Sequence, residues 1–271
     1  MRTIAFIGGG NMAKALLGGL VAAGQPRRSV LVVEPDEAQR RLLVERFDVT
    51  ALAAAEASLA AAEIVIWAVK PQAFPAASAP CKRYLGSALH LSVMAGIRSD
   101  AIVAATGANR VVRAMPNTPA LIGQGIAGVF ARAAVTADDR ARVESLLKPT
   151  GELVWVDREE ALDAVTALSG SGPAYVFFLV EAMLAAAGSM GLPEADAKRL
   201  ALQTVAGATA LLAHSSEPPG TLRRQVTSPG GTTHAAMTLL DERGVKAAFI
   251  DAILAARDRA RELGDEFDVS T

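Results

Sequence analysis

Cysteine, histidine and aromatic residues are scarce in this chain, and each scarcity narrows what the protein can be. Of 271 residues one is a cysteine, Cys81, which excludes a disulfide within the chain and a cysteine-rich metal site. The three histidines, His90, His214 and His234, stand far apart and form no metal-ligand spacing. Aromatic residues make up only 4%, so the apolar 51% is mostly alanine, valine and leucine, as in tightly packed α/β and helical proteins. We therefore expect no metal centre and a sizeable aliphatic core.

An excess of charge is lacking too. The net charge is −1, which argues against nucleic acid or an anionic membrane as the main partner. The first residues show no charged-then-apolar signal region, because glycines follow from position 8. We expect a soluble cytoplasmic protein.

The most informative stretch is at the start of the chain. Residues 3–7 form an apolar run that predicts a buried strand, and three glycines follow it directly. The spacing Gly8-x-Gly10-x-x-Ala13 fits the dinucleotide fingerprint, with a helix that begins near Asn11. Gly8 would allow the tight turn, Gly10 the approach of a pyrophosphate, and Ala13 close helix packing. The helix N-terminus, with Asn11 and Met12, would face the phosphates. An ordinary glycine-rich turn is the alternative, but it does not require three consecutive glycines.

The rest of the chain falls into two parts. Strand-like runs alternate with helical patterns up to residue 157, which predicts a mostly parallel sheet with helices on both faces, some of it mixed. After residue 157 the pattern is helical. We therefore predict an α/β Rossmann-like domain over residues 1–157 and an all-α domain over residues 158–271. Beyond the first strand, the predicted strands are Val30–Glu34, Ile64–Val69, Ala88–Met94, Arg110–Met115, Ile126–Phe130 and Leu153–Val156.

Local signals predict how several helices begin and end. Pro35 suits the first turn of a helix that reaches Phe47. Ser99 and Thr136 are expected to cap the helices that follow them. The residues Ser169-Gly170-Ser171-Gly172-Pro173 are expected to interrupt a helix, and the nearly all-apolar stretch after them, Pro173–Met190, is either a core helix or a subunit interface.

Two glycine- and hydroxyl-rich turns could bind an anion. They are residues 169–173 and Ser228-Pro229-Gly230-Gly231-Thr232-Thr233, each at the start of a predicted helix. Helix capping is the alternative for each. Two such turns in one helical domain favour a shared carboxylate-binding site.

Two strand ends should face the ligand crevice, because ligands of open α/β sheets bind at the carboxyl ends of strands. They are Trp67–Gln72 and Arg113–Pro119. Lys70 could contact a phosphate or the substrate, or it could be a solvated lysine. The prolines around Asn117 fix the backbone there, and Asn117 can bond neighbouring main chain, so this segment is expected to form a wall against the cofactor.

No acid–base machinery is evident. The chain shows no nucleophilic serine elbow, no paired-carboxylate signature and no Walker lysine. His234 follows Thr233, but its place within a helix favours a structural role. A dinucleotide enzyme without such a residue suggests hydride transfer to a substrate that needs little proton help. An imine fits, since its nitrogen is basic and can be protonated from solvent.

These motifs together resemble the pyrroline-5-carboxylate reductase family. The resemblance covers essentially the whole chain and rests on five motifs in order. They are residues 7–13 (IGGGNMA), 68–71 (AVKP), 113–119 (RAMPNTP), 169–175 (SGSGPAY) and 228–233 (SPGGTT).

The resemblance implies reduction of L-1-pyrroline-5-carboxylate to L-proline, the last step of proline synthesis, with NADPH or NADH as cofactor. It implies a homodimer through the helical domain, and a homodecamer as a further assembly. Thr233 would be catalytic, as a hydrogen-bond donor near the ring nitrogen. The substrate-binding residues would be Ser171, Ser228, Gly230, Gly231, Thr232 and Thr233. The cofactor-binding residues would be Gly8, Gly10, Asn11, Met12, Glu34, Ala68, Val69, Lys70, Pro71, Ala114, Met115, Pro116 and Asn117.

Glu34 bears on the choice of cofactor. It closes the second strand, where a carboxylate bonds the ribose 2′-hydroxyl of NADH and repels the 2′-phosphate of NADPH. Arg40 and Arg41 follow within the next helix and could partly offset it. We expect NADH to be used at least as well as NADPH.

Rival functions are a reductase of the same architecture for a 3-hydroxy acid or another cyclic imine, and a non-catalytic nucleotide sensor. Hydroxy-acid enzymes of this type carry a lysine in the first long helix of the second domain, and Pro173–Met190 contains none. The intact 228–233 motif argues against a sensor.

Overall fold

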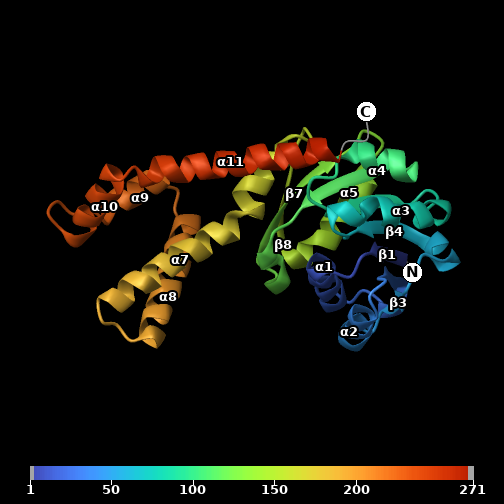
Figure 1. Ribbon diagram of the computed structural model, residues 1–271, viewed down its shortest axis with the longest axis horizontal. Helices are drawn as coiled ribbons and strands as arrows, with labels where there is room; N and C mark the ends of the chain where they lie inside the picture. The colour runs from blue at the N-terminus through green and yellow to red at the C-terminus, as the bar shows by residue number, and fades with distance from the viewer. Residues whose placement is uncertain (1–2, 268–271) are drawn as a thin grey trace. The chain divides into compact units, whose positions relative to one another are not determined.

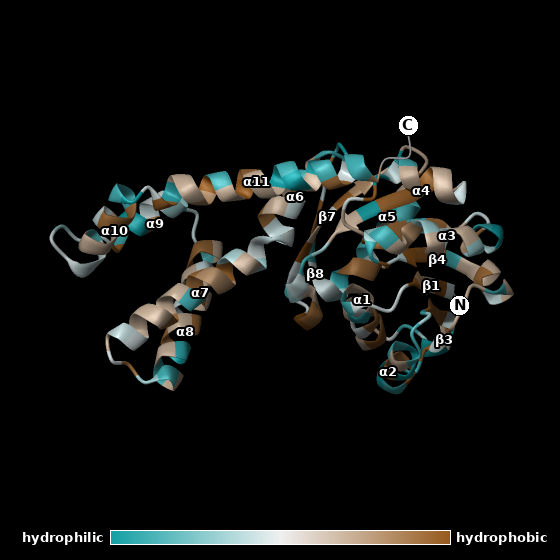
Figure 2. Cartoon of the chain, viewed as in Figure 1, coloured by the Kyte–Doolittle hydropathy of each residue, from teal (hydrophilic) through white to brown (hydrophobic). Residues whose placement is uncertain are grey.

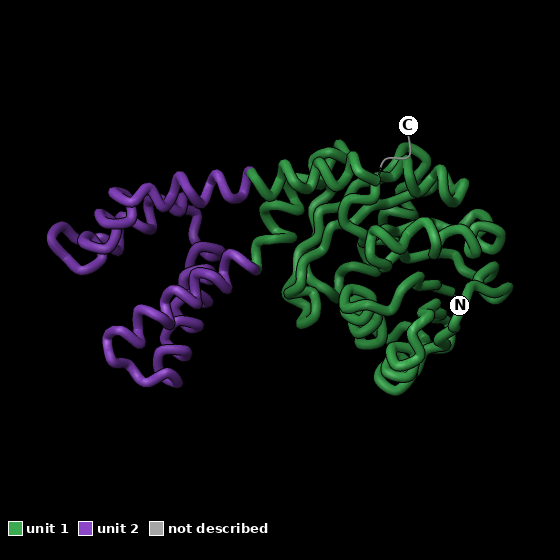
Figure 3. Tube along the Cα trace, in the orientation of Figure 1, with its two compact units in different colours: residues 1–173, 255–271 green, residues 174–254 purple. Residues whose placement is uncertain are grey.

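The computed structural model describes residues 3–267, and the chain divides into two compact units (Figure 1, Figure 3). Residues 1–173 and 255–271 form the first unit, and residues 174–254 form the second. The division predicted at residue 157 follows the end of the last strand. By compactness the first unit extends further, because the start of the helical part and the end of the last helix both pack against the sheet unit.

The first unit is built on one eight-stranded sheet with the order β3-β2-β1-β4-β5-β6-β7-β8. Neighbouring strands are parallel except β6 and β7, which are antiparallel, so the expectation of a mostly parallel, partly mixed sheet is confirmed. The strands are β1 (Thr3–Ile7), β2 (Val30–Val33), β3 (Thr50–Leu52), β4 (Ala62–Trp67), β5 (Leu89–Ser92), β6 (Val111–Met115), β7 (Gly125–Ala131) and β8 (Gly151–Trp155).

Two apolar cores lie on the two faces of this sheet. Successive residues of a strand point to opposite faces, so Ile4 and Phe6 of β1 join one core while Ala5 and Ile7 join the other. Helices α1 (Asn11–Ala22), α2 (Glu37–Phe47) and α5 (Ala137–Leu147) contribute to the first core. Helices α3 (Phe74–Cys81) and α4 (Ser99–Thr106) contribute to the second.

Of the three predicted helix starts, one is confirmed and two are wrong. Thr136 caps α5 in a reciprocal capping box with Asp139. Pro35 lies before α2, whose cap is Asp36. Ser99 is the first residue of α4 and not its cap, because its hydroxyl and amide both donate to the distant carboxylate of Glu159.

The glycine-rich residues 169–173 do not interrupt the helical chain, contrary to expectation. Helix α6 (Ala161–Val165) continues into a π-helical turn, Thr166–Gly170, and then into α7 (Gly172–Ser189). The Ser171 amide donates to the carbonyl of Thr166 at 2.8 Å, the wider spacing of a π turn. A Cβ at Gly170 would lie 2.8 Å from the Met115 Cε atom, so the glycine lets the π turn lie close to the end of β6.

The second unit has almost no core of its own. It contains most of α7, then α8 (Glu194–His214), α9 (Pro219–Gln225), α10 (Thr232–Glu242) and the first part of α11 (Val245–Glu266). Among residues 174–254 the buried side chains are Ala187, Ala197 and Ala201. Phe177 and Phe178 of α7 are 63% and 71% exposed, and Figure 2 shows hydrophobic bands along these helices. The core-helix reading of α7 is therefore wrong for the single chain.

By length and composition alone the helical segment Ala161–Ser189 is sufficient to cross a membrane, and 6% of its most apolar window is buried. An apolar face exposed to this extent marks a surface that some partner covers.

His90 of β5 is buried without a full set of hydrogen bonds. The Trp67 indole donates to its Nδ1 atom at 3.0 Å, which places the proton of the neutral ring on Nε2. Nε2 has no partner among the described residues. Burial, and secondarily the positive charge of Arg110, lowers the pKa of His90 from 6.5 to about 4.

This arrangement predicts a pH-dependent stability. Between pH 4 and 6.5 the unfolded chain protonates His90 and the folded chain does not, so the free energy of unfolding should rise with pH across this window, by about 3 kcal/mol at most. Urea unfolding at a series of pH values measures the slope. His90→Gln keeps an acceptor for Trp67 and should flatten the slope, whereas replacing the exposed His214 with Gln should not. An equal slope in His90→Gln and the wild type would contradict the assignment.

Candidate active site

Most of the predicted cofactor residues gather at one edge of the sheet. The ends of β1, β2 and β4 are in register, with Ile7 paired to both Val33 and Trp67. The segments that follow these strands therefore emerge together, at the carboxyl edge where open α/β sheets bind ligands. The predicted residues Gly8 to Met12, Glu34 and Ala68 to Pro71 lie in these segments, and β6 brings Ala114 to Asn117 to the same edge.

Gly8 makes the tight turn that the sequence predicts. Its φ angle is +99°, a conformation that other residues rarely adopt. Its amide donates to the Val33 carbonyl at 2.9 Å, which fixes the turn against β2. A Cβ at this position would lie 2.7 Å from the Ala68 carbonyl oxygen. Gly8 therefore lets the loop after β1 and the end of β4 lie in contact.

Gly9 has a structural role that the sequence analysis missed. A Cβ at Gly9 would lie 2.5 Å from Leu43 Cδ1 of α2, and the Gly9 amide donates to Glu34 Oε2 at 2.8 Å. The other carboxylate oxygen of Glu34 accepts from the Asp36 amide at 3.0 Å. The half-buried Glu34 carboxylate is thus held directly against the glycine turn. Only the partners of Gly9 in the folded chain reveal why it must be glycine.

Gly10 and the first turn of α1 form an open cradle. A Cβ at Gly10 would meet no heavy atom of the described residues within 4 Å, so the position is free toward solvent. Gly10 is the N-cap of α1, and no side chain among residues 3–267 caps this helix end. The N–H groups of the first turn and the helix dipole are therefore available to an anion. Asn11 is exposed and Met12 is half-buried beside them. The residues present fit the pyrophosphate of a dinucleotide.

The two arginines after Glu34, Arg40 and Arg41, have different hydrogen-bond partners. Arg40 folds back, and its Nη1 atom donates to the carbonyls of Glu34 and Pro35 at 2.9 and 2.6 Å. Arg41 instead pairs with Glu37 on the exposed face of α2. Of the two, Arg40 is therefore the one that contacts the main chain at Glu34.

The other two strand ends supply mainly backbone. After β4, Ala68 and Val69 are half-buried while Lys70 is exposed, and Pro71 begins a short 3₁₀ turn. After β6, Ala114 and Pro116 are buried. The side-chain amide of Asn117 forms two hydrogen bonds. Its Oδ1 accepts from the Ile126 amide at 3.0 Å, and its Nδ2 donates to the Ser169 carbonyl at 3.2 Å. Asn117 bonds main chain, as expected, and ties the end of β6 to the π turn.

The second motif, residues 228–233, forms the connection from α9 to α10 within the second unit. The Gly231 amide donates to the Ser228 carbonyl at 3.0 Å, and Gly230 has a φ angle of +71°. Proline followed by a glycine of positive φ is the signature of a type II turn. Gly231 is the N-cap of α10, and no side chain among the described residues caps this helix end. The capping alternative for the hydroxyls is therefore wrong.

The first turn of α10 is thus a second uncapped helix end, whose N–H groups are available to an anion. Thr232 and Thr233 occupy its first positions, and Thr233 is half-buried while Thr232 and Ser228 are exposed. Amides and hydroxyls at a helix N-terminus suit a carboxylate. Ser171 belongs to the first unit and lies just after the π turn, so residues 169–173 are not a second helix start of this kind.

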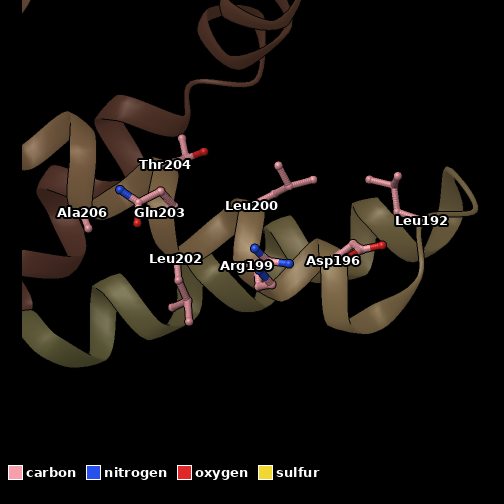
Figure 4. A pocket seen from close by; sticks show the side chains of 8 residues that line it. All are labelled: Leu192, Asp196, Arg199, Leu200, Leu202, Gln203, Thr204 and Ala206. Carbon is pink, nitrogen blue, oxygen red and sulfur yellow. The ribbon is translucent and has the colours of Figure 1, made fainter.

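A large hollow lies elsewhere. It is a pocket of about 1000 Å³ in the second unit, and Figure 4 shows the side chains that line it, Leu192 and residues of α8. Its lining combines leucines with Asp196 and Arg199 and includes none of the predicted site residues. Cavity volume alone therefore does not locate the chemistry. Among residues 3–267, no group of three or more His, Cys, Asp or Glu side chains is placed to bind a metal ion.

Comparisons with known proteins agree with these two halves. Residues 159–263 match the family model described as pyrroline-5-carboxylate reductase dimerisation, and residues 3–96 match the model described as NADP oxidoreductase coenzyme F420-dependent. Pyrroline-5-carboxylate reductase of Pseudomonas aeruginosa is 42% identical over 267 residues, 97% of each chain. The Escherichia coli enzyme is 38% identical over 265 residues, 97% of this chain and 98% of its own.

Solved structures give the same result. A pyrroline-5-carboxylate reductase from Coxiella burnetii superposes with a TM-score of 0.88 at 35% identity, over 97% of this chain and 98% of its own. Pyrroline carboxylate reductase from Plasmodium falciparum, solved with NADP bound, gives 0.88 at 27% identity over the same shares. With its two-part fold, its glycine turn and relatives of this similarity along nearly its whole length, the chain belongs to the pyrroline-5-carboxylate reductase family.

Proposed function

We propose that this chain reduces L-1-pyrroline-5-carboxylate to L-proline, the final step of proline biosynthesis, with hydride from a reduced nicotinamide nucleotide. The observation that carries the proposal is the open, uncapped first turn of α1 at Gly10, which fits a pyrophosphate. The identity of the substrate is inferred from membership of the family. The bound cofactor supplies the hydride, and the protein supplies binding, orientation and electrostatics.

We assign the recognition of the substrate carboxylate to the α10 end, through the amides and hydroxyls of residues 228–233, with Ser171 as a further polar contact. Thr233 donates a hydrogen bond to the ring nitrogen as the lone pair of that nitrogen forms during hydride addition to the imine carbon. The imine nitrogen is basic and takes its proton from solvent, so no acid–base side chain is required. Catalysis is then mostly positioning of the imine carbon and stabilisation of charge at the nitrogen.

On the cofactor side, Gly8, Gly10, Asn11 and Met12 cradle the pyrophosphate, and Glu34 accepts from a ribose hydroxyl. The segments 68–71 and 114–117 form the wall against the nicotinamide half. The chain uses an NAD(P) cofactor, as its family does, and we propose that it uses NADH at least as well as NADPH. The contact between the Gly9 amide and Glu34 supports this preference, since it holds a negative charge where a 2′-phosphate would lie. Arg40 moderates it.

The test is an assay of purified protein with L-1-pyrroline-5-carboxylate and either NADH or NADPH, followed by cofactor absorbance. We expect oxidation of both, with kcat/KM for NADH at least equal to that for NADPH. Glu34→Gln keeps an oxygen for the Gly9 amide and removes the negative charge. The ratio of kcat/KM with NADPH to kcat/KM with NADH should therefore increase about tenfold, which corresponds to one charge-assisted hydrogen bond.

Glu37→Gln is the matched control, because this neighbouring carboxylate is exposed and pairs with Arg41 on the surface of α2. It should leave the ratio unchanged. Cofactor binding without oxidation by any imine would refute the proposed function, whereas a Glu34→Gln ratio equal to that of the wild type would refute only the role of Glu34.

The chain carries the family's dimerisation region, and we propose that it forms a homodimer through the exposed apolar faces of α7 and α8. A homodecamer is the further assembly that the resemblance implies. We propose that a second copy, in place of lipid, covers these faces and that the protein is soluble and cytoplasmic. Light scattering should give a solution mass of two or more chains of 28.0 kDa.

A further inference from the structure

Strand β6 extends beyond its neighbours at the carboxyl edge of the sheet. Ile7 of β1, Trp67 of β4 and Ser92 of β5 are paired in one row and are the last residues of their strands. Arg113 of β6 continues this row, and β6 then runs on to Met115. At about 3.3 Å per residue, the end of β6 rises about 7 Å above the row. It therefore forms a side wall of the ligand crevice.

The π turn lies against this wall. Met115 is paired with Gly128 of β7. A Cβ at Gly128 would lie 2.7 Å from the side chain of Val165, the last residue of α6, just as a Cβ at Gly170 would meet Met115. Val165 and Gly170 thus both face the sheet, although residues five apart do not share a face of an α-helix. The wider π turn makes this arrangement possible.

Asn117 fastens the π turn to the main chain that follows β6. Its Nδ2 atom donates to the Ser169 carbonyl at 3.2 Å, while its Oδ1 atom accepts from the Ile126 amide of β7 at 3.0 Å. Asn117 is also the N-cap of the 3₁₀ turn Thr118–Ile122, which contacts α1, the helix of the pyrophosphate cradle. All of these residues belong to the first unit. One side chain therefore joins the wall, the π turn and β7.

The surface held in this way suits a planar ring with a polar group. Gly170, Ser171 and Gly172 are half-buried, and a Cβ at Gly172 would meet no heavy atom of the described residues within 4 Å. Glycines let a ligand approach the main chain closely. The half-buried thioether of Met115 can contact an aromatic ring, and the Ser171 hydroxyl can bond an amide.

The topology places the two halves of a bound dinucleotide on opposite sides of the glycine turn. Glu34, assigned to a ribose hydroxyl, follows β2 on one side of β1, whereas β4, β5 and β6 continue the sheet on the other side. The nicotinamide half therefore extends toward the wall at the end of β6. We propose that the π turn forms part of the nicotinamide site and that Asn117 is a positioning residue, which holds the π turn at the distance that the ring requires. This inference rests on the proposed function.

Parallel titrations with NADH and ADP-ribose test the proposal, because ADP-ribose has both riboses and the pyrophosphate of the cofactor but no nicotinamide. Asn117→Ala removes both hydrogen bonds, and Asn117→Asp keeps the acceptor for Ile126 and removes the donor to Ser169. In both variants the Kd for NADH should rise about tenfold, as expected for a lost hydrogen bond, while the Kd for ADP-ribose stays within about twofold. Calorimetry measures both constants.

Thr106→Ala is the matched control. The Thr106 hydroxyl also donates to one main-chain carbonyl, that of Ile102, and accepts from one main-chain amide, that of Ala108. Thr106 ends α4, before β6 begins, and so lies at the opposite edge of the sheet. Thr106→Ala should lower Tm and leave the ratio of the two Kd values unchanged. A ratio that rises as in Asn117→Ala would mean that lost stability alone is the cause, and it would overturn the proposal.

Gly170→Ala tests the second contact and decides the question if the Asn117 variants do not fold. The added methyl group would meet Met115 Cε, the end of a flexible side chain, so the fold should accommodate it. We expect the ratio of the Kd for NADH to the Kd for ADP-ribose to rise several-fold. The side chain in Met115→Leu ends one atom short of Cε, so Gly170→Ala should not change the ratio in that background.

The titrations require no imine, so their result is independent of turnover. A Kd ratio equal to that of the wild type in Asn117→Ala and Gly170→Ala, or equal increases of both Kd values, would overturn the proposal. Absence of imine turnover in the wild type would instead refute the proposed function, and the Kd ratios would still decide whether Asn117 positions the π turn for the nicotinamide.

Discussion

Gly10→Val should abolish cofactor binding and leave the fold intact. The position opens to solvent at the uncapped end of α1, and a Cβ there meets no heavy atom of the described residues within 4 Å. The methyl groups of valine would occupy the place of the pyrophosphate. Several charge-assisted hydrogen bonds to first-turn amides would be lost, each worth about 1.5–3 kcal/mol, so the Kd for NADH should rise at least about a hundredfold. Fluorescence titration with NADH measures this, and thermal unfolding checks the fold.

Two other glycines of α1 and its turn serve as controls for this result. Gly18→Ala should bind NADH as the wild type does, because Gly18 lies on α1 away from the cradle. Gly8→Ala should lower Tm, because Gly8 has φ +99° and its Cβ would meet the Ala68 carbonyl. Wild-type affinity in Gly10→Val would mean that the phosphates bind elsewhere.

Thr233→Ala should lower kcat about ten- to a hundredfold, the value of one hydrogen bond to a group that carries charge in the transition state. The hydroxyl lies in the uncapped first turn of α10, where it has no capping role to lose. The KM for the imine should change less than kcat, and the Kd for NADH should not change, since the cofactor cradle is in the other unit. Steady-state kinetics with a parallel NADH titration separates these three quantities.

Thr233→Ser should recover most of the lost kcat, because serine keeps the hydroxyl. Thr238→Ala is the control on the same helix. The Thr238 hydroxyl donates to the His234 carbonyl at 3.0 Å, and its loss should leave kcat unchanged. Kinetics of Thr233→Ala equal to those of the wild type would remove the hydroxyl from the mechanism.

The parts of the fold that depend on local patterns could be predicted from the sequence. Apolar runs marked β1, β2 and β4 to β8, and Thr136 with Asp139 marked the start of α5. The three residues of β3 are too few for a run to stand out, and α3 carries Pro75 and Pro80, which obscure a helical pattern. Neither β3 nor α3 was predicted, because neither has a distinct local pattern in the sequence.

Apart from the start of α2, where the neighbouring Asp36 is the cap in place of Pro35, the errors have one physical origin, which is partners distant in the sequence. Ser99 has the composition of a helix cap, but it bonds Glu159, sixty positions on. Gly9 must be glycine because of Leu43 and Glu34, and the π turn packs on Met115. The candidate site was predictable at the level of segments, because the glycine turn and the strand ends are local signals. Which of the two arginines, Arg40 or Arg41, stands beside Glu34 depends on how each side chain folds, and the sequence left both open.

The second unit buries three alanines and leaves most of its large apolar side chains exposed. A unit with so little interior of its own gains its folding free energy from association, so its stability obeys mass action. The Tm of the intact chain should then increase with protein concentration, and strong dilution should unfold residues 174–254 before the sheet unit. For such a protein, the concentration at which it is expressed is itself a determinant of how much of it is active.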